Sequence, residues 1–171
     1  MNEQIPTLTL ENCSLVPLRV EDASALHRVY QGEDMLKYFP DRNPPPLERV
    51  ERFIVSQQKH WEQRGYGNWG LLPAGENQII GWAGLQYLPE LAETEVGFLL
   101  DRSFWGRGIA TQAARAALRF GFETCNLPRI IALVHPDNLA SRRVIGKCGM
   151  AYEETIHLWG IDLMRHCLDR T

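Results

Sequence analysis

The sequence predicts an α/β fold, in which strand-like and helix-like segments alternate along a chain of 171 residues. Residues 47–64 place apolar side chains at helical spacing, and residues 109–125 are expected to form a second long helix. Residues 129–134 are a continuous apolar run, which is typical of a buried strand. A glycine-rich turn separates the strand-like residues 93–100 from the second of these helices.

The first third of the chain is expected to hold a strand, two helices and a loop. A short strand over residues 14–19 precedes a helix that has an acidic start and covers residues 20–31. Residues 38–46 include three consecutive prolines, and because proline lacks an N–H donor and disfavours helix, this segment is expected to be a loop. The helix over residues 47–64 is expected to end at Gly65.

The rest of the chain is expected to add six strands and two helices, separated by turn-forming residues. No repeat, linker or low-complexity tract divides the sequence, so residues 1–171 are expected to form one domain. The expected strands are 67–72, 78–88, 93–100 and 129–134, followed by a hairpin over 150–169 that turns near 158–160, and the expected helices are 109–125 and 138–148.

Composition and charge exclude several classes of function. The formal net charge of −3 leaves no basic surplus for neutralising phosphates, so nucleic acid is not an expected partner. The four cysteines are widely separated and form no CxxC pair, which favours reduced thiols and no metal site. No apolar run is long enough to cross a bilayer and residues 1–11 carry no targeting pattern, so a cytoplasmic protein without a membrane partner is expected.

The strongest local signal is the turn over residues 102–111, between a predicted strand and a predicted helix. Gly106 and Gly108 lack Cβ atoms where the backbone must turn, so several N–H groups and the helix N-terminus can converge on an anion such as a pyrophosphate. Arg107 and Thr111 could add donors. For the two glycines taken alone, a plain loop and helix cap is the alternative, and the spacing fits neither a Walker loop nor a dinucleotide fingerprint.

Three segments together are far more specific than the glycine pair: Thr94–Leu100, Phe104–Thr111 and Asn138–Met150. With them, nearly the whole chain resembles the GCN5-related N-acetyltransferase (GNAT) superfamily, and within it the ribosomal-protein N-terminal acetyltransferases. The resemblance implies a mixed, twisted, mostly antiparallel sheet flanked by helices. It also implies that strand 93–100 and strand 129–134 splay apart and leave a V-shaped slot for the pantetheine arm of acetyl-coenzyme A.

The resemblance further implies how acetyl-coenzyme A is held. Amides of the turn bind the pyrophosphate, the backbone of Phe98 and Leu100 pairs with the pantetheine amides like an added strand, and Asn138 contacts the pantetheine arm. Many members of the superfamily have a tyrosine at the position of Ile145 that can protonate the departing thiolate, and this chain departs from that pattern. The expected cofactor-binding residues are Phe98, Leu99, Leu100, Trp105, Gly106, Arg107, Gly108, Ile109, Ala110, Thr111, Asn138 and Ser141.

Transfer of an acetyl group to an amine requires a base, a donor that polarises the thioester carbonyl and a weak acid, but no metal. The donor could be a strand amide near Leu99 or Leu100. Glu95 is the expected catalytic base because it lies on the strand that leads to the cofactor, where burial would raise its pKa. Glu93 is the reserve candidate for the base. The alternative is that Glu95 is an ordinary solvated carboxylate without a catalytic role. The resemblance puts Ser141, the second expected catalytic residue, near the thioester sulfur, although serine in the first turn of a helix is also a common cap.

The expected substrate-binding residues are the aromatic residues Tyr38, Phe39 and Trp82. Tyr38 and Phe39 precede the proline loop, which the resemblance puts beside the acceptor entrance, whereas most aromatic residues at regular spacing belong to a core. An acidic cluster at that entrance would favour a polycationic acceptor, and the candidates for such a cluster are Glu90, Glu93 and Glu95.

The sequence therefore predicts an acyltransferase that moves the acetyl group of acetyl-coenzyme A directly to an amine. The acceptor could be a protein N-terminus, as the ribosomal-protein branch implies, or a small amine such as a polyamine, an aminoglycoside or an amino-acid derivative. The alternative, motivated by Ile145, is a catalytically silent binder of acyl-coenzyme A that senses or docks. The terminal hairpin and exposed aromatic residues could support a homodimer.

Overall fold

The structure, a computed structural model, describes residues 5–171. Residues 1–4, which begin the N-terminal stretch without a targeting pattern, lie outside the described residues. No helix in the described part of the chain is both long and apolar enough to cross a membrane.

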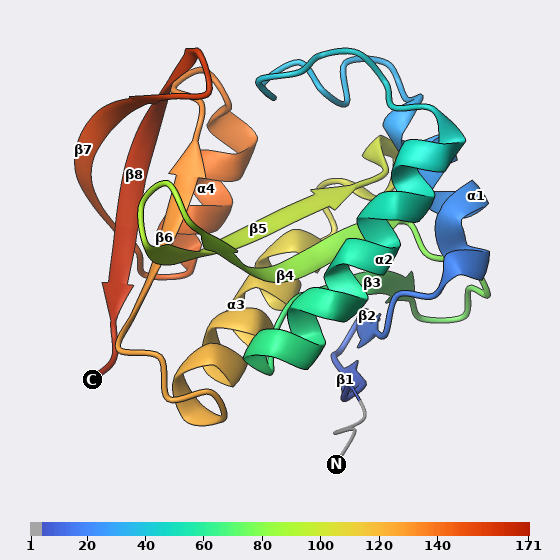
Figure 1. Ribbon diagram of the computed structural model, residues 1–171, viewed down its shortest axis with the longest axis horizontal. Coiled ribbons are helices and arrows are strands. Elements are labelled where there is room, and N and C mark those ends of the chain that lie inside the picture. The colour runs from blue at the N-terminus through green and yellow to red at the C-terminus, as the bar shows by residue number, and fades with distance from the viewer. Residues whose placement is uncertain (1–4) are drawn as a thin grey trace.

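An eight-stranded mixed sheet runs through the molecule, and helices pack against it (Figure 1). The strand order is β1-β2-β3-β4-β5-β6-β8-β7, and the β5–β6 pair is parallel while the other pairs are antiparallel. The predicted α/β class and mostly antiparallel mixed sheet are therefore confirmed. The strands are β1 Leu8–Thr9, β2 Cys13–Val16, β3 Asn68–Pro73, β4 Gly81–Leu88, β5 Glu93–Leu100, β6 Arg129–Val134, β7 Ala151–Leu158 and β8 Ile161–Asp169. The helices are η1 Val20–Asp22, α1 Ala23–Tyr30, α2 Leu47–Arg64, η2 Arg102–Phe104, α3 Ile109–Glu123 and α4 Leu139–Lys147.

Several boundaries differ from the prediction. The sequence did not predict β1, because two residues are too few to show a periodic pattern. β2 ends at Val16 rather than at residue 19, because Pro17 has no N–H to continue the ladder. The first helix begins as the 3-10 turn η1, where the Asp22 carboxylate accepts a hydrogen bond from the Arg19 N–H at 2.9 Å. β4 begins at Gly81 rather than at residue 78.

The two faces of the sheet pack against different helices. On one face Trp69, Leu85 and Ile130 belong to a core cluster with Ala113 and Ala117 of α3. Each of these five side chains is fully buried. Small alanine side chains let α3 lie close to the strands, so this helix and its N-terminus are held firmly against β4 and β5.

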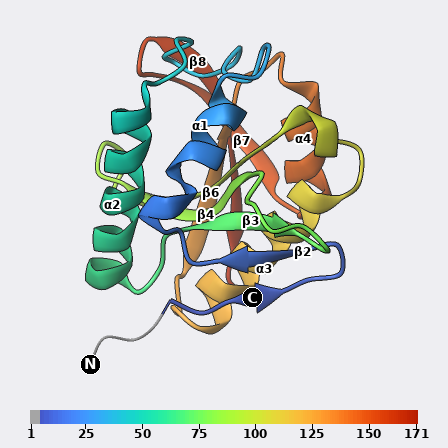
Figure 2. The same ribbon diagram turned by 90° about the vertical axis from the view of Figure 1, so that its right-hand side faces the viewer.

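The other face packs against α1 and α2. Leu26 of α1 and Val50 and Ile54 of α2 form a cluster with Ile79, which precedes β4. Figure 2 shows α2 and α4 on opposite sides of the molecule. The irregular connection between α1 and α2, residues 31–46, lies between these two helices in sequence and is packed onto β5 through Met35 and Leu99.

Candidate active site

The sheet opens between its two central strands. β5 pairs with β4 over all eight of its residues, and β6 pairs with β8 over all six of its residues. Between β5 and β6, however, the register contains a single pair, Glu95 with Ile131. Figure 1 shows β6, β8 and β7 running at a steep angle to β4 and β5. The two central strands therefore splay apart beyond Glu95, as the sequence predicted for strands 93–100 and 129–134.

The backbone of β5 leaves hydrogen-bonding groups on the open side of this splay. The Asp101 N–H, just after β5, donates to the Ile80 carbonyl on the β4 side at 2.7 Å. Because backbone groups alternate in direction along a strand, those of Leu99 also face β4, and those of Phe98 and Leu100 face the opening. Leu99 and Leu100 are both candidates for the residue whose N–H donates to the thioester carbonyl. The alternation favours Leu100. The Leu100 carbonyl itself accepts a hydrogen bond from the Trp105 indole N–H at 2.9 Å.

The glycine-rich turn presents a row of free backbone donors. Gly106 and Gly108 adopt left-handed backbone with φ of 75° and 76°, and Gly108 precedes the first residue of α3. The first hydrogen bond inside the helix runs from the Gln112 N–H to the Gly108 carbonyl at 3.0 Å. Within residues 5–171, the six successive N–H groups of residues 106–111 donate to no protein acceptor. Free N–H groups that converge at a helix N-terminus form a site for an anion such as a pyrophosphate.

Side chains fix the shape of this turn. The Asp101 carboxylate accepts hydrogen bonds from the Ser103 N–H at 2.8 Å and from the Ser103 hydroxyl at 2.6 Å. Arg107 donates to the Ser103 carbonyl at 3.2 Å, and its guanidinium lies 4.9 Å from the ring centre of Phe104. The Arg107 side chain, which the sequence offered as a phosphate ligand, is thus folded back against its own turn, and the free donors here are main-chain groups.

Glu95 lies where the splay begins. Its carboxylate accepts a hydrogen bond at 3.3 Å from the N–H of Leu133 in β6. Leu133 lies two residues beyond Ile131, the partner of Glu95, so its backbone also faces β5. Burial raises the pKa of Glu95 to about 7, and the Leu133 N–H offsets only part of that rise. A carboxyl with this pKa exchanges its proton readily near neutral pH, as a general base must.

Glu93, the reserve candidate, is bound differently. Arg165 of β8 forms an ion pair with the Glu93 carboxylate and also contacts Glu153 at 3.1 Å and Glu154 at 3.0 Å. The Arg165 and Glu93 side chains are 16% and 22% exposed, so this ion pair is largely shielded from water, whereas Glu154 is exposed. A carboxylate held by a partly buried guanidinium is a structural partner, which leaves Glu95 as the better candidate for a base.

The first turn of α4 holds Asn138 and Ser141. The Asn138 side-chain oxygen accepts a hydrogen bond from the Ser141 N–H at 3.1 Å, so Asn138 caps the helix. The Ser141 hydroxyl makes no hydrogen bond within the described residues. Ile145, one turn further along the same helix face, is 2% exposed and belongs to the core cluster. The partly exposed Ser141 hydroxyl therefore lies on the same face of α4 as Ile145 and is free to donate a hydrogen bond.

Two of the aromatic candidates, Trp82 and Phe39, lie on the face of the sheet that carries Glu95. Trp82 pairs with Leu99, and Gln86 with Glu95, so the side chains of all four share one face. Phe39 packs with Trp82 and Leu99 in a small cluster. The missing side chain of Gly97 makes room for the indole, because a Cβ there would lie 3.2 Å from the Trp82 ring.

Tyr30, the last residue of α1, and Tyr38, in the connection that follows it, each contact one side of the opening. The Trp82 indole N–H donates to the Tyr30 hydroxyl at 2.9 Å, and burial raises the pKa of Tyr30 to about 12, so this hydroxyl stays protonated. Tyr38 stacks against His135, just after β6, with ring centres 5.2 Å apart. The structure thus places Trp82 on the Glu95 face with Phe39 packed beside it, whereas Tyr38 contacts His135 on the β6 side.

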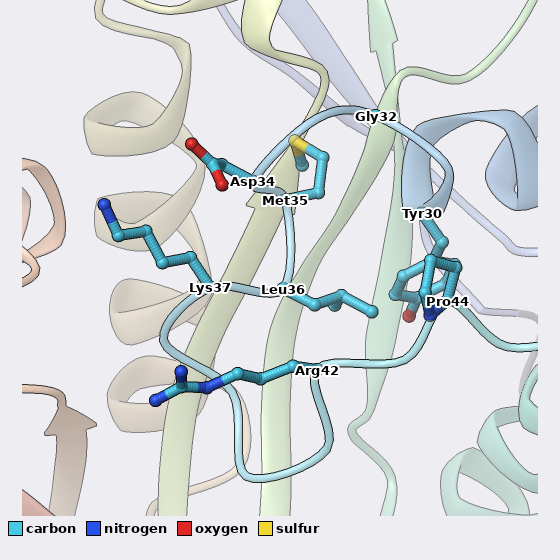
Figure 3. A pocket seen from close by; sticks show the side chains of 8 residues that line it. All are labelled: Tyr30, Gly32, Asp34, Met35, Leu36, Lys37, Arg42 and Pro44. Carbon is cyan, nitrogen blue, oxygen red and sulfur yellow. The ribbon is translucent and has the colours of Figure 1, made fainter.

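A cavity of about 390 Å³ lies in the α1–α2 connection (Figure 3). Sequence reasoning missed it, because residues 31–46 are irregular and carry no periodic signal; Lys37 and Arg42 were indistinguishable from ordinary surface cations. The lining residues are Tyr30, Gly32, Asp34, Met35, Leu36, Lys37, Arg42 and Pro44.

The described residues contain no group of three or more His, Cys, Asp or Glu side chains placed to hold a metal ion. The four cysteines are free thiols, and burial raises the pKa of Cys13, Cys125, Cys148 and Cys167.

Known proteins resemble this chain along most of its length. A relative from Aspergillus fumigatus, FsC-acetyl coenzyme A-N(2)-transacetylase, is 33% identical over 88% of this chain and 67% of its own. The uncharacterised protein YkkB of Bacillus subtilis is 36% identical over 58% of this chain and 62% of its own, and the spermidine N(1)-acetyltransferase of Escherichia coli K12 is 25% identical over 84% and 75%. The chain therefore spans about two thirds of the length of the first two relatives.

Solved structures share the fold. An acetyltransferase from Agrobacterium tumefaciens matches with a TM-score of 0.84 and 26% identity over 99% of this chain and 98% of that one. RimL, a ribosomal L7/L12 α-N-protein acetyltransferase solved in complex with coenzyme A, matches with a TM-score of 0.78 and 18% identity over 96% and 98%, a likeness of fold. The family model for the acetyltransferase (GNAT) domain matches residues 13–151. Together with the splayed strands and the glycine turn, these matches identify the chain as a member of the GNAT acetyltransferase family.

Proposed function

We propose that this GNAT acetyltransferase moves the acetyl group of acetyl-coenzyme A directly to a primary amine, which belongs to a protein N-terminus or to a small molecule. One observation carries the proposal. The opening between β5 and β6 begins at Glu95, and the row of free N–H groups at residues 106–111 follows the same strand β5. A candidate base and a candidate pyrophosphate site therefore serve one opening.

The residues at the opening fit acetyl-coenzyme A, which when bound supplies an acetyl group activated as a thioester. The free N–H groups of residues 106–111 match the negative charge of a pyrophosphate. The backbone of Phe98 and Leu100 offers strand-like hydrogen bonds on the open side of β5. In this proposal Trp105 shapes the turn, through its hydrogen bond to Leu100, rather than contacting phosphate.

Glu95 would take the proton from the attacking amine, directly or through a water molecule. An amine attacks only in its neutral form, so a base near the reacting atoms raises the rate. With its pKa raised to about 7, Glu95 is partly ionised at neutral pH and is a stronger base than an ordinary carboxylate. The Leu133 N–H orients the carboxylate.

Ser141 would stabilise or protonate the departing thiolate. Ile145 has no hydroxyl and is buried in the core, so it cannot take the role that a tyrosine has in many relatives. The Ser141 hydroxyl is free to donate because the helix cap uses only the backbone N–H of this residue. Asn138 would then position Ser141 through the cap, in addition to any contact with the pantetheine arm.

The acidic residues named for a polycationic acceptor have partners in the protein. Arg165 binds Glu93, and the Glu90 carboxylate accepts a hydrogen bond from the Trp159 indole at 3.2 Å. These contacts weaken the case for a polyamine. The likeness to RimL concerns the fold, and the spermidine enzyme is only 25% identical, so neither decides the acceptor.

The test is thiol release from acetyl-coenzyme A with peptides that have free N-termini, polyamines and aminoglycosides as acceptors. Cofactor binding is first measured as a rise in melting temperature. Binding with turnover of one acceptor class would support the proposal and select the class. Binding without turnover across the panel would favour the silent acyl-coenzyme A binder, and no binding would overturn the proposal.

A further inference from the structure

The cavity in the α1–α2 connection is lined by two cations, and the only polar or cation–π contact of either charge within residues 5–171 is that of the Lys37 ammonium, 5.5 Å from the ring centre of Tyr38. Within residues 5–171, neither Lys37 nor Arg42 forms an ion pair or a side-chain hydrogen bond; the nearby Asp41 pairs instead with Arg49. Asp34 is the one acidic side chain among the lining residues, so the lining carries two positive charges against one negative. Figure 3 shows Asp34, Lys37 and Arg42 extending to one side, away from Tyr30 and Pro44.

Exposed lysine and arginine side chains are usually just solvated, but the cavity wall is joined to the strands that carry the proposed base. Met35 packs against Leu99 of β5, and Tyr30 accepts a hydrogen bond from Trp82, whose ring lies against Gly97. Leu99 lies four residues beyond Glu95 on the same face of β5, which is about 13 Å along the strand. A small molecule can span that distance between its amine and its far end. The Glu95 side chain shortens the gap at one end, and the Lys37 and Arg42 side chains shorten it at the other.

The remaining charges at the opening do not compete for the same ligand. Glu93 is bound by Arg165, and Glu90 by Trp159. Glu95, the proposed base, is needed for the amine. Among the charges that line the cavity, the cations Lys37 and Arg42 outnumber the carboxylate Asp34, so the net charge on the α1–α2 connection there is positive.

Resting on the proposed function, we propose that the acceptor is an amine with a carboxylate at its far end, and that Arg42 and Lys37 bind this carboxylate at the cavity. The planar guanidinium of Arg42 can donate two parallel hydrogen bonds to a carboxylate, and the Lys37 ammonium adds a second positive charge. The same two cations repel an acceptor with a second ammonium group, so they select against diamines and polyamines.

Three acceptors of equal length test this selection: ε-aminocaproate, its amide and hexamethylenediamine. They present a negative, a neutral and a positive far end to the same enzyme. For the wild type, kcat/KM measured by thiol release should be about tenfold higher for the carboxylate than for either of the others, the usual effect of a hydrogen bond to a charged group. A rate for the amide or the diamine that equals or exceeds that of the carboxylate would overturn the proposal.

Variants assign the selection to these residues. Arg42→Gln and Lys37→Gln should each reduce the preference for the carboxylate, mainly by raising KM, and the double variant should abolish it. Arg170→Gln is the matched control, because Arg170 is an exposed cation near the C-terminus, which Figure 1 shows at the end of the molecule away from the α1–α2 connection. Preference that survives in the double variant, or that is lost equally in the control, contradicts the assignment.

A binding measurement keeps the test independent of turnover. The coenzyme A-loaded protein is titrated with N-acetyl-ε-aminocaproate and with its amide, and binding is followed by NMR. The wild type should bind the carboxylate about tenfold more tightly than the amide, and the double variant should bind both ligands equally weakly. Equal binding of the two ligands, or binding of neither, overturns the proposal.

Acetyl-coenzyme A thermal shifts separate this inference from the proposed function. If acetyl-coenzyme A fails to stabilise even the wild type, the proposed function itself fails. If it stabilises the wild type but not the Arg42→Gln and Lys37→Gln proteins, the two cations serve the cofactor and the acceptor proposal is wrong. Equal stabilisation of wild type and variants is the result expected here.

Discussion

Glu95 combines three properties that a general base requires. It lies at the end of the paired part of β5 and β6, its carboxylate is oriented by the Leu133 N–H, and burial raises its pKa to about 7. The sequence supported the choice of residue through strand alternation alone. It could not supply the hydrogen bond to Leu133, because that contact joins residues 38 positions apart and depends on how β5 and β6 separate.

Replacing Glu95 tests the base directly. A protonated carboxyl cannot accept the proton of the amine, so the wild-type kcat/KM should fall as the pH drops through about 7. Glu95→Gln should lower kcat/KM by about a hundredfold or more and keep only the pH dependence of the acceptor amine. Glu62→Gln, the same change at an exposed position of α2, should leave the profile unaltered. If kcat/KM of Glu95→Gln still falls as the pH drops through about 7, that pH dependence belongs to another group.

The same residue should make stability depend on pH. Its carboxyl has a pKa of about 7 when folded against a model value of 4.5, so the folded state binds more protons between these values and stability falls as the pH rises through them. Glutamine cannot ionise, so Glu95→Gln should melt at a higher temperature than the wild type at about pH 8. The difference should shrink towards about pH 5. A constant difference, or none, would mean that Glu95 ionises normally in the folded protein.

Variants of Ser141 and Asn138 distinguish a catalytic role of the Ser141 hydroxyl from the helix cap that Asn138 forms. Ser141→Ala keeps the backbone N–H that bonds to Asn138, so it should lower kcat by about a hundredfold with an unchanged melting temperature. Asn138→Ala removes the cap and should cost about 1 kcal/mol of stability. Rates and melting curves of the two variants make the comparison. A Ser141→Ala protein that turns over normally would leave the thiolate without the acid assigned to it.

At the scale of single elements, the glycine turn depends on backbone conformation rather than on crowding. A Cβ at Gly106 would meet no atom within 4 Å, yet φ at this residue is 75°, where most residues are strained. The constraint on Gly106 is therefore its left-handed backbone conformation, at the start of the row of free N–H groups of residues 106–111.

Substitutions at Gly106 should follow this conformational preference. Valine should weaken acetyl-coenzyme A binding about tenfold, because the left-handed conformation costs most residues about 1–2 kcal/mol. Asparagine, which adopts this conformation more readily, should weaken binding less. Calorimetric titration of the three proteins gives the order of affinities. Equal affinity of glycine, asparagine and valine would show that the turn does not need its left-handed residue.

The elements that the sequence predicted well are those with a strong local pattern. The segments 47–64, 93–100 and 129–134 have the predicted bounds, because a long amphipathic helix and apolar strands carry a periodic signal. β1 and the cavity of residues 31–46 could not be predicted, because a two-residue strand and an irregular connection have none. The Arg165–Glu93 pair joins positions 72 apart and becomes visible only when β5 and β8 are folded together.

At the scale of the whole molecule, the opening is a consequence of how the sheet is joined. The β4–β5 ladder and the β6–β8 ladder are continuous, whereas one residue pair links β5 to β6. Two well-paired halves can therefore diverge without breaking a regular ladder, and the free backbone groups of β5 gather at the point of divergence. The helices α1 and α2 cover one face and α3 the other, so the opening is supported from both sides.

The expected homodimer remains a prediction. Tyr152 and Trp159 of the terminal hairpin are 53% and 43% exposed, in agreement with the exposed aromatic residues on which that expectation depends.

A crystal structure with coenzyme A bound is the most direct test of the central claim, that the β5–β6 opening is the site of acetyl transfer. The account predicts the pyrophosphate at the N–H groups of residues 106–111, the pantetheine arm hydrogen-bonded to β5 at Phe98 and Leu100, and the thiol between Glu95 and Ser141. Coenzyme A bound at another surface, or with its thiol away from both of these residues, would contradict it.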